Sequence, residues 1–339
     1  MRFRLLAVLL TLTAVPASAA AAAPAGSADL ASARPAAALS ASAWPVEIDG
    51  RTADRYPEGI AWDPTRQAFL IGSIATGRIS VVQRDGSARV LAQAPGVSTF
   101  GLHVDAVRNR FLVTYGDIGN GERSSDATAY KQSGVGIYNL RTGRLERRVD
   151  LNTTRLNPAG GRHGVNDLAI DAVGNAYVTD PAGDAIYKIT PLGRASVLVR
   201  DDRLRSDTIG ANGIIWDSAG YLVTVRYDTG QLFRISSGGR MSEVAVGKRL
   251  VGGDGLALTP DQRLVAITNK LGAPGVEAAT VLTSRDNFRS AQVRSTEAWP
   301  VPGPTTAAVT PHGIYVLSGR IDVLIGGGRS DEFTIRRLP

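Results

Sequence analysis

The stretch GVNDLAIDAVGNAYVTDPAG, residues 164–183, has the pattern of a β-hairpin with a polar entrance. Asn166 and Asp167 precede a short run of alternating apolar residues, a Gly-Asn turn follows, and a second apolar run ends at Asp180. Alternation with a period of two is typical of half-buried strands, and a Gly-Asn pair between two such runs is a common hairpin turn. The stretch therefore predicts two antiparallel strands with oxygen-bearing side chains at one end.

The same phrase recurs along the chain as a small residue, apolar alternation, Asp or Thr, a turn and a second apolar strand. Its six copies begin at Gly59, Gly101, Asp167, Gly213, Gly255 and Thr306. Further apolar segments with Gly, Asp or Asn turns separate the copies, at 78–91, 135–150, 185–199, 231–246 and 279–294. Units of roughly 40–50 residues with four short strands are typical of propeller blades.

We therefore predict an all-β fold, a six-bladed β-propeller in which residues 44–49 and 333–337 together complete one blade. A pair of β-sandwiches is the alternative, but sandwiches do not require a recurring phrase at the same place in every unit.

The residue before each copy is the second feature of the repeat. In chain order these residues, which we call the mouth residues, are Glu58, Phe100, Asn166, Asn212, Asp254 and Thr305. Equivalent positions in a propeller lie on a ring around the central channel, so four oxygen-bearing side chains would converge there, with Asp167 beside them. Asn or Asp before Gly is also a common turn, so each position alone would indicate only a turn. Four of them in register favour a binding site.

Two carboxylates and two amides form a set of hard oxygen ligands. Ca²⁺ accepts such ligands at varied angles, whereas Zn²⁺ prefers nitrogen or sulfur and Mg²⁺ requires a stricter octahedron. The sequence predicts a calcium site at the mouth of the central channel.

Composition limits the other function classes. The chain has 339 residues, a formal net charge of +7 and no cysteine, so no disulfide and no thiolate ligand contributes. The basic residues are scattered and are not interleaved with aromatic residues, so we expect no nucleic-acid partner.

The N-terminus predicts export. Residues 1–19 combine Arg2 and Arg4 with an apolar run and a small-residue end, which is the pattern of a signal peptide. The Ala/Pro/Ser-rich segment 20–43 predicts a disordered leader. Residues 44–339 would form a single domain, secreted or periplasmic, with no membrane contact after signal cleavage. We expect a monomer with a small-molecule substrate.

Four stretches resemble the blade motifs of calcium-dependent six-bladed propellers, namely the senescence marker protein/gluconolactonases, diisopropylfluorophosphatase and the paraoxonases. They are PEGIAWDP from Pro57, VNDLAID followed by GNAYVTDPAG from Val165, ANGIIWD from Ala211 and GDGLALTPD from Gly253. The resemblance implies that one catalytic calcium ion is held by Glu58, Asn166, Asn212 and Asp254.

The second calcium ion of the fluorophosphatase would require an acidic residue shortly after the Asp-Gly pair. Here Ala257 follows that pair, so we expect one ion or a different second site. Related propellers of the strictosidine synthase type lack the metal-binding set, so its presence argues against that branch.

The resemblance implies a calcium-dependent hydrolase of lactones, esters or phosphotriesters, with the ion as Lewis acid. Asp254 is the first candidate for the carboxylate that attacks or activates water, and Asp167 is the second. A non-catalytic, calcium-stabilised binding propeller and a calcium-independent biosynthetic propeller of the strictosidine synthase type are the alternatives.

Substrate contacts are expected from loops above the ion. The candidates are His163, just before Asn166, and residues at the ends of second strands: Tyr115, Asp117, Asp180, Arg226 and Asn269. The polar insertion 116–134 would be either a lid over this pocket or a disordered surface loop.

Overall fold

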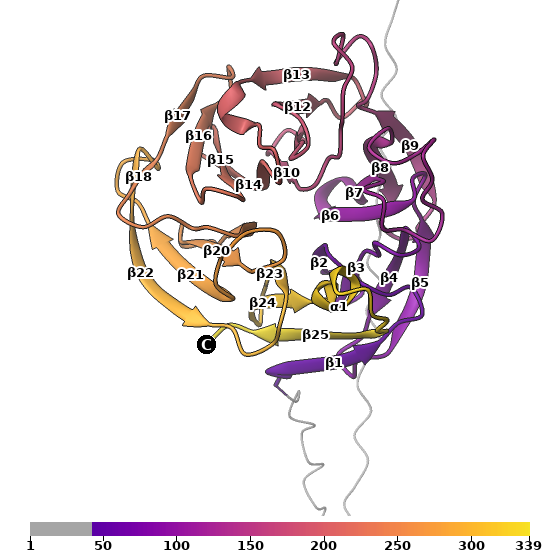
Figure 1. The fold of residues 1–339 in the computed structure, drawn as a ribbon. Helices are drawn as coiled ribbons and strands as arrows, with labels where there is room; N and C mark the ends of the chain where they lie inside the picture. The colour runs from indigo at the N-terminus through magenta and orange to yellow at the C-terminus, as the bar shows by residue number, and fades with distance from the viewer. Residues whose placement is uncertain (1–42) are drawn as a thin grey trace, which may run out of the picture. The chain divides into compact units, whose positions relative to one another are not determined.

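The computed structural model describes residues 43–339, and the segments predicted as signal peptide and leader lie outside the described residues except for Ala43. Residues 44–339 form one compact unit. Its strands make six sheets, which Figure 1 shows arranged in a ring, each sheet running from an inner to an outer strand. This is a six-bladed β-propeller, as the repeat predicted.

Five blades follow the chain from the inside outward. The first blade consists of β2 (Ile60–Asp63), β3 (Ala68–Ile71), β4 (Arg78–Val82) and β5 (Ala88–Gln93), and the second of β6 (Ser98–Asp105), β7 (Arg110–Gly116), β8 (Ser133–Asn139) and β9 (Leu145–Asp150). The third consists of β10 (Leu168–Ile170), β11 (Ala176–Thr179), β12 (Ala185–Ile189) and β13 (Ala195–Arg200), and the fourth of β14 (Ala211–Asp217), β15 (Tyr221–Arg226), β16 (Leu232–Ser236) and β17 (Met241–Glu243). The fifth consists of β19 (Gly253–Leu258), β20 (Leu264–Thr268), β21 (Ala278–Thr283) and β22 (Ser290–Ala298), with β18 (Ala245–Val246) parallel to β22 at the outer edge.

The sixth blade joins the two ends of the described chain. It consists of β23 (Pro304–Thr310), β24 (Gly313–Ser318), β25 (Glu332–Arg337) and the N-terminal strand β1 (Glu47–Arg51). Strand β1 pairs antiparallel with β25, with Ile48 opposite Ile335. This confirms the predicted closure, because the N-terminal strand adds the outermost strand of the last blade. The strand itself begins at Glu47, while Trp44 packs edge-on against Trp62 with ring centroids 4.9 Å apart.

Apolar residues pack between adjacent blades. Leu70 and Val81 of the first blade, for example, share a buried cluster with Phe111 and Val113 of the second. Residues that alternate along each strand therefore face one neighbouring blade or the other, which explains the period-two pattern in the sequence.

Helical structure is minor. The described residues contain one short α-helix, α1 (Ile321–Ile325), between β24 and β25, and two 3₁₀ turns, at Ala106–Arg108 and Asp202–Leu204. In residues 43–339 no helix reaches the length and apolarity that crossing a membrane requires.

The insertion between β7 and β8 is folded around one buried carboxylate. Asp117 accepts hydrogen bonds from the Gly119 amide and the Ser124 hydroxyl, each at 2.8 Å, and from the Thr128 hydroxyl at 2.6 Å. The side chain of Asp117 is fully buried. The segment thus forms a defined rim element of the second blade.

Candidate metal centre

The mouth residues lie where the pairing between the first and second strands of a blade is interrupted or has not yet begun. In four blades the pairing between the first and second strands skips two residues, and the first of each skipped pair is a mouth residue: Phe100, Asn212, Asp254 and Thr305. In the other two blades the first strand begins just after the equivalent positions, at Ile60 and Leu168. Bulges of this kind turn a side chain out of the alternating pattern of the strand.

The structure brings the four predicted ligands together. Glu58, Asn166, Asn212 and Asp254 line one cavity of about 210 Å³. The Asn166 amide donates to Oε1 of Glu58 at 3.2 Å, and the Asn212 side chain hydrogen-bonds to Asp254. Glu58, Asn212 and Asp254 are only 7%, 3% and 6% exposed. Phe100 lines the same cavity, whereas Thr305 is not among its lining residues and instead contacts the Glu58 backbone.

The two carboxylates of this set are electrostatically unbalanced. Burial, reinforced by the charges of Asp254 and Asp167, raises the pKa of Glu58 well above its usual value. Burial also raises the pKa of Asp254 to about 7, although hydrogen bonds from Asn269 and Asn212 oppose the shift. Among the described residues, no Lys, Arg or His lines this cavity. A bound cation would supply the missing positive charge.

One buried amide oxygen also lacks a partner. Oδ1 of Asn212 has no hydrogen-bond donor within reach. Leaving a buried acceptor unpaired costs about 1–3 kcal/mol, and coordination of a cation would remove this cost. The donors are all oxygen, which suits Ca²⁺. Within residues 43–339, no three His, Asp or Glu side chains form a metal-binding group by themselves, so this set depends on its two asparagines. The residues present fit a calcium ion.

Comparison with protein families identifies the group to which this architecture belongs. Residues 56–229 match the family model described as the SMP-30/gluconolactonase/LRE-like region, which covers half of the chain and three of the four ligand positions. The chain belongs to the SMP-30/gluconolactonase/LRE-like family. No curated protein matches it.

Solved structures share the fold of this SMP-30-like propeller at low identity. The major allergen Mala s 1 of Malassezia sympodialis is 20% identical with a TM-score of 0.69, over 88% of this chain and 97% of that chain. A gluconolactonase from Xanthomonas campestris is 15% identical with a TM-score of 0.57, over 84% and 86%. Virginiamycin B lyase from Staphylococcus aureus is 14% identical with a TM-score of 0.53, over 86% and 99%. These likenesses establish the fold alone.

Buried threonine hydroxyls fix the backbone of the ligand positions in this SMP-30-like chain. Thr305 donates to the Glu58 carbonyl at 2.7 Å, Thr179 donates to the Asn212 carbonyl at 2.6 Å, and Thr114 donates to the Asn166 carbonyl. In each case the hydroxyl and the carbonyl belong to adjacent blades. The ligand ring is therefore held by contacts between blades, and its geometry depends on closure of the propeller.

Asn269 orients Asp254. Its amide donates to Oδ2 of Asp254 at 2.6 Å and to the Pro304 carbonyl at 2.8 Å. Its own oxygen accepts from the Tyr227 hydroxyl and from the Leu271 amide. All four hydrogen bonds are satisfied and Asn269 is fully buried, so the carboxylate of Asp254 has a fixed direction.

The predicted pocket residues do not line the cavity themselves. None of His163, Tyr115, Asp117, Asp180, Arg226 and Asn269 is among the described residues that line it. The residues that do line it follow most of them in sequence: Ile118, Gly164, Pro181, Tyr227 and Leu271. Successive side chains in a strand point in opposite directions. An error of one position in register therefore assigns to the cavity wall a residue whose side chain points away from the cavity.

Each of the six residues has a structural partner instead. Asp180 accepts from Nδ1 of His163 at 2.7 Å and from the Gly164 amide at 3.0 Å, which fixes the segment leading to Asn166. The remaining contacts are those of Asp117 within the insertion, Asn269 with Asp254, Tyr115 with Asp150 at 2.6 Å, and Arg226 with Asp228 at 2.7 Å.

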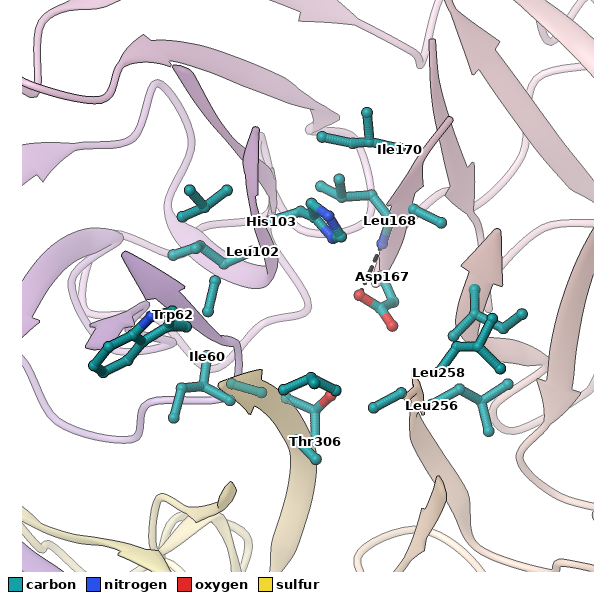
Figure 2. A pocket seen from close by; sticks show the side chains of 18 of the residues that line it. Ile60, Trp62, Leu102, His103, Asp167, Leu168, Ile170, Leu256, Leu258 and Thr306 are labelled. Atoms are coloured by element: carbon teal, nitrogen blue, oxygen red, sulfur yellow. Dashed lines mark hydrogen bonds between the residues drawn. The ribbon is translucent and has the colours of Figure 1, made fainter. Parts of the chain in front are cut away.

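Asp167 faces the channel rather than the cavity of the four ligands. It lines a second cavity of about 390 Å³ along the first strands of the blades, mainly among apolar residues such as Ile60 and Leu256. Figure 2 shows its carboxylate directed into this space, with Oδ1 accepting from the Leu168 amide at 2.8 Å. Burial raises the pKa of Asp167 to about 7.

Proposed function

We propose that this protein is an exported, calcium-dependent hydrolase of lactones, esters or phosphotriesters. The observation that carries the proposal is the unpartnered oxygen of Asn212 beside two buried carboxylates, in a cavity whose lining, within residues 43–339, contains no Lys, Arg or His. Membership of the SMP-30/gluconolactonase/LRE-like family supports a lactonase-type activity.

The residues divide the chemistry among themselves. Glu58, Asn166, Asn212 and Asp254 would hold the calcium ion, which when bound supplies a Lewis acid for a carbonyl or phosphoryl oxygen. We assign to Asp254 the role of base or nucleophile, because it lines the cavity open to a substrate and Asn269 fixes its direction. Asp167 is the weaker candidate, since it lines the channel cavity instead.

Calcium binding is the first test. We expect calorimetry on chelator-treated protein to show binding of Ca²⁺ with one dominant site, and we expect Glu58→Gln to weaken it by about 10–100-fold. Glu146→Gln, which changes an exposed glutamate, is the matched control and should bind as the wild type does. Absence of binding to the wild type, or equal binding by Glu58→Gln, would exclude this metal site.

Turnover is the second test. Wild type and Asp254→Asn are assayed with aryl esters, sugar lactones, alkyl lactones and phosphotriesters, and Asp261→Asn, a surface aspartate paired with Arg263, is the control. We expect hydrolysis of at least one class and a loss of about a hundredfold or more in Asp254→Asn. Full activity in Asp254→Asn contradicts its assigned role. Calcium binding without turnover of any class would instead support a calcium-stabilised binding propeller.

A further inference from the structure

The cavity above the four ligand residues has apolar walls. Phe100, Ile118, Ile209, Leu271 and Leu324 line it from five separate parts of the chain. Most of these side chains pack in one cluster with Ile74 and Ile321. These side chains therefore support one another as a single apolar wall, and several of them are partly exposed toward the cavity.

The short helix α1 contributes one side of this wall. Ile321, Leu324 and Ile325 all line the cavity, and Ile325 is 54% exposed. Figure 1 shows α1 beside β23 and β24, near the inner strands of the ring. Three branched aliphatic residues of this helix thus add apolar surface to the cavity that the four ligand residues also line.

Few polar groups are free to bind a substrate. Besides the four ligand residues, the polar side chains that line the cavity are Asn120, Tyr130, Thr208 and Tyr227. The Tyr227 hydroxyl already donates to Asn269 and accepts from the Gly272 amide at 2.9 Å. The Tyr130 ring is covered by the Arg162 guanidinium at 3.7 Å, and the Asn120 and Thr208 side chains are exposed to solvent.

A sugar lactone would bring several hydroxyl groups into this space. Each buried hydroxyl without a partner opposes binding, whereas each buried methylene favours it. The described lining contains no Lys, Arg or His, and its carboxylates and inner amides belong to the ligand set.

We propose that the site selects a lipophilic substrate, a lactone or ester carrying an alkyl or aryl group, and discriminates against polyhydroxylated sugar lactones. This inference rests on the proposed hydrolase function. The apolar group of the substrate lies against α1, Phe100, Ile118 and Leu271, while its carbonyl faces the four ligand residues.

The test is a series of γ-lactones with alkyl chains of increasing length, compared with D-glucono-δ-lactone on the calcium-loaded protein. We expect kcat/KM to rise about fourfold per methylene until the cavity is filled. The sugar lactone should be at least tenfold poorer than the best alkyl lactone. A flat dependence on chain length, or preference for the sugar lactone, overturns the inference and leaves the hydrolase function intact.

A substitution in helix α1 tests whether the apolar wall contacts the alkyl chain of the substrate. Leu324→Ala should lower kcat/KM for the longest lactone roughly tenfold, while the unsubstituted lactone and calcium affinity change by less than about twofold. Leu192→Ala is the matched control, because Leu192 is 80% exposed in a turn away from the cavity. An equal loss for short and long lactones in Leu324→Ala contradicts a specific contact with the chain.

Binding of the corresponding alkyl lactams, which resist hydrolysis, separates this inference from the proposed activity. Affinity that increases with chain length in calorimetry supports the apolar site even if no lactone is turned over, in which case only the hydrolase function fails. Affinity independent of chain length counts against the apolar site.

Discussion

Hydrogen bonds from residues that do not themselves bind the ion fix the orientation of the Asp254 carboxylate. Asn269 donates to Oδ2 of Asp254 at 2.6 Å. We predict that Asn269→Leu lowers calcium affinity by about 10–100-fold, because residues that orient metal ligands typically contribute this much. Calorimetry with Ca²⁺ measures the change, and circular dichroism verifies that the variant is folded.

Tyr227→Phe is the graded comparison for Asn269→Leu. It removes one of the two donors to the Asn269 oxygen and leaves the Leu271 amide at 3.1 Å. We expect a smaller loss of calcium affinity than in Asn269→Leu. Wild-type affinity in Asn269→Leu would show that Asp254 does not depend on this contact.

Residues differ in how far the sequence reveals them. The mouth residues were predictable because each precedes a recognisable repeat, so a shared position could be read for six blades at once. The pocket walls were not, because the ends of strands carry no periodic signal that fixes register. Arg226 was expected in the wall, but its neighbour Tyr227 lines the cavity, while Arg226 pairs with Asp228.

At the scale of strands, the innermost hairpins approach too closely for side chains at certain positions. A Cβ atom on Gly213 would overlap the carbonyl oxygen of Asp254 in the next blade, and one on Gly59 would overlap that of Phe100. The glycine after a mouth residue thus allows adjacent mouths to lie side by side. The sequence indicated Gly213 as a turn residue and Gly59 as the small residue that opens a repeat, and the packing between blades explains why both are glycine.

We predict that Gly213→Ala lowers the free energy of unfolding by about 1–3 kcal/mol, the usual cost of overpacking. It should also weaken calcium binding, because the displaced segments carry both Asn212 and Asp254. Denaturant unfolding and calorimetry measure the two effects. Gly247→Ala is the matched control, since a Cβ there meets no atom within 4 Å. Equal stability of the two variants would contradict the close approach.

Helix α1 and the insertion after β7 are the elements that sequence patterns left undefined. Five residues are too few to establish helical periodicity, so nothing in residues 321–325 distinguished α1 from a loop. The insertion, which was expected to be a lid or a disordered loop, is organised by the buried side chain of Asp117. Both elements supply side chains to the apolar wall, Leu324 and Ile118 among them.

At the scale of the whole molecule, closure of the propeller brings the buried carboxylates of different blades close together. Strand β1 joins β25, and Thr305 of the same blade donates to the Glu58 carbonyl of the first, so the last blade holds a ligand position in the first. The charges of Asp254 and Asp167 raise the pKa of Glu58, and the charge of Asp167 raises the pKa of Asp254. Their repulsion acts against a closed ring when no cation is bound.

The sign of this effect follows from linkage. Burial raises the pKa of Asp254 and of Asp167 to about 7, and raises that of Glu58, whereas unfolded Asp and Glu titrate near pH 4. A raised pKa in the folded state means that protonation stabilises the fold. This contribution is complete below about pH 4 and is lost as the pH rises through about 7. Calcium binding requires the ionised ligands Glu58 and Asp254, so it becomes stronger over the same interval.

We therefore predict that the stabilisation by calcium increases with pH. At a calcium concentration a hundredfold above Kd, the gain is about 2.7 kcal/mol, or roughly 4 °C in Tm for a domain of this size. We expect this gain in full at pH 8 and mostly lost at pH 5 for the same calcium concentration. Scanning calorimetry with calcium or chelator at both pH values measures it. Surface ion pairs also titrate in acid, so Glu58→Gln is the control: it should lose most of the calcium effect and show a flatter pH dependence in chelator. A calcium gain equal at pH 5 and pH 8 would mean that the ion does not bind to these buried carboxylates.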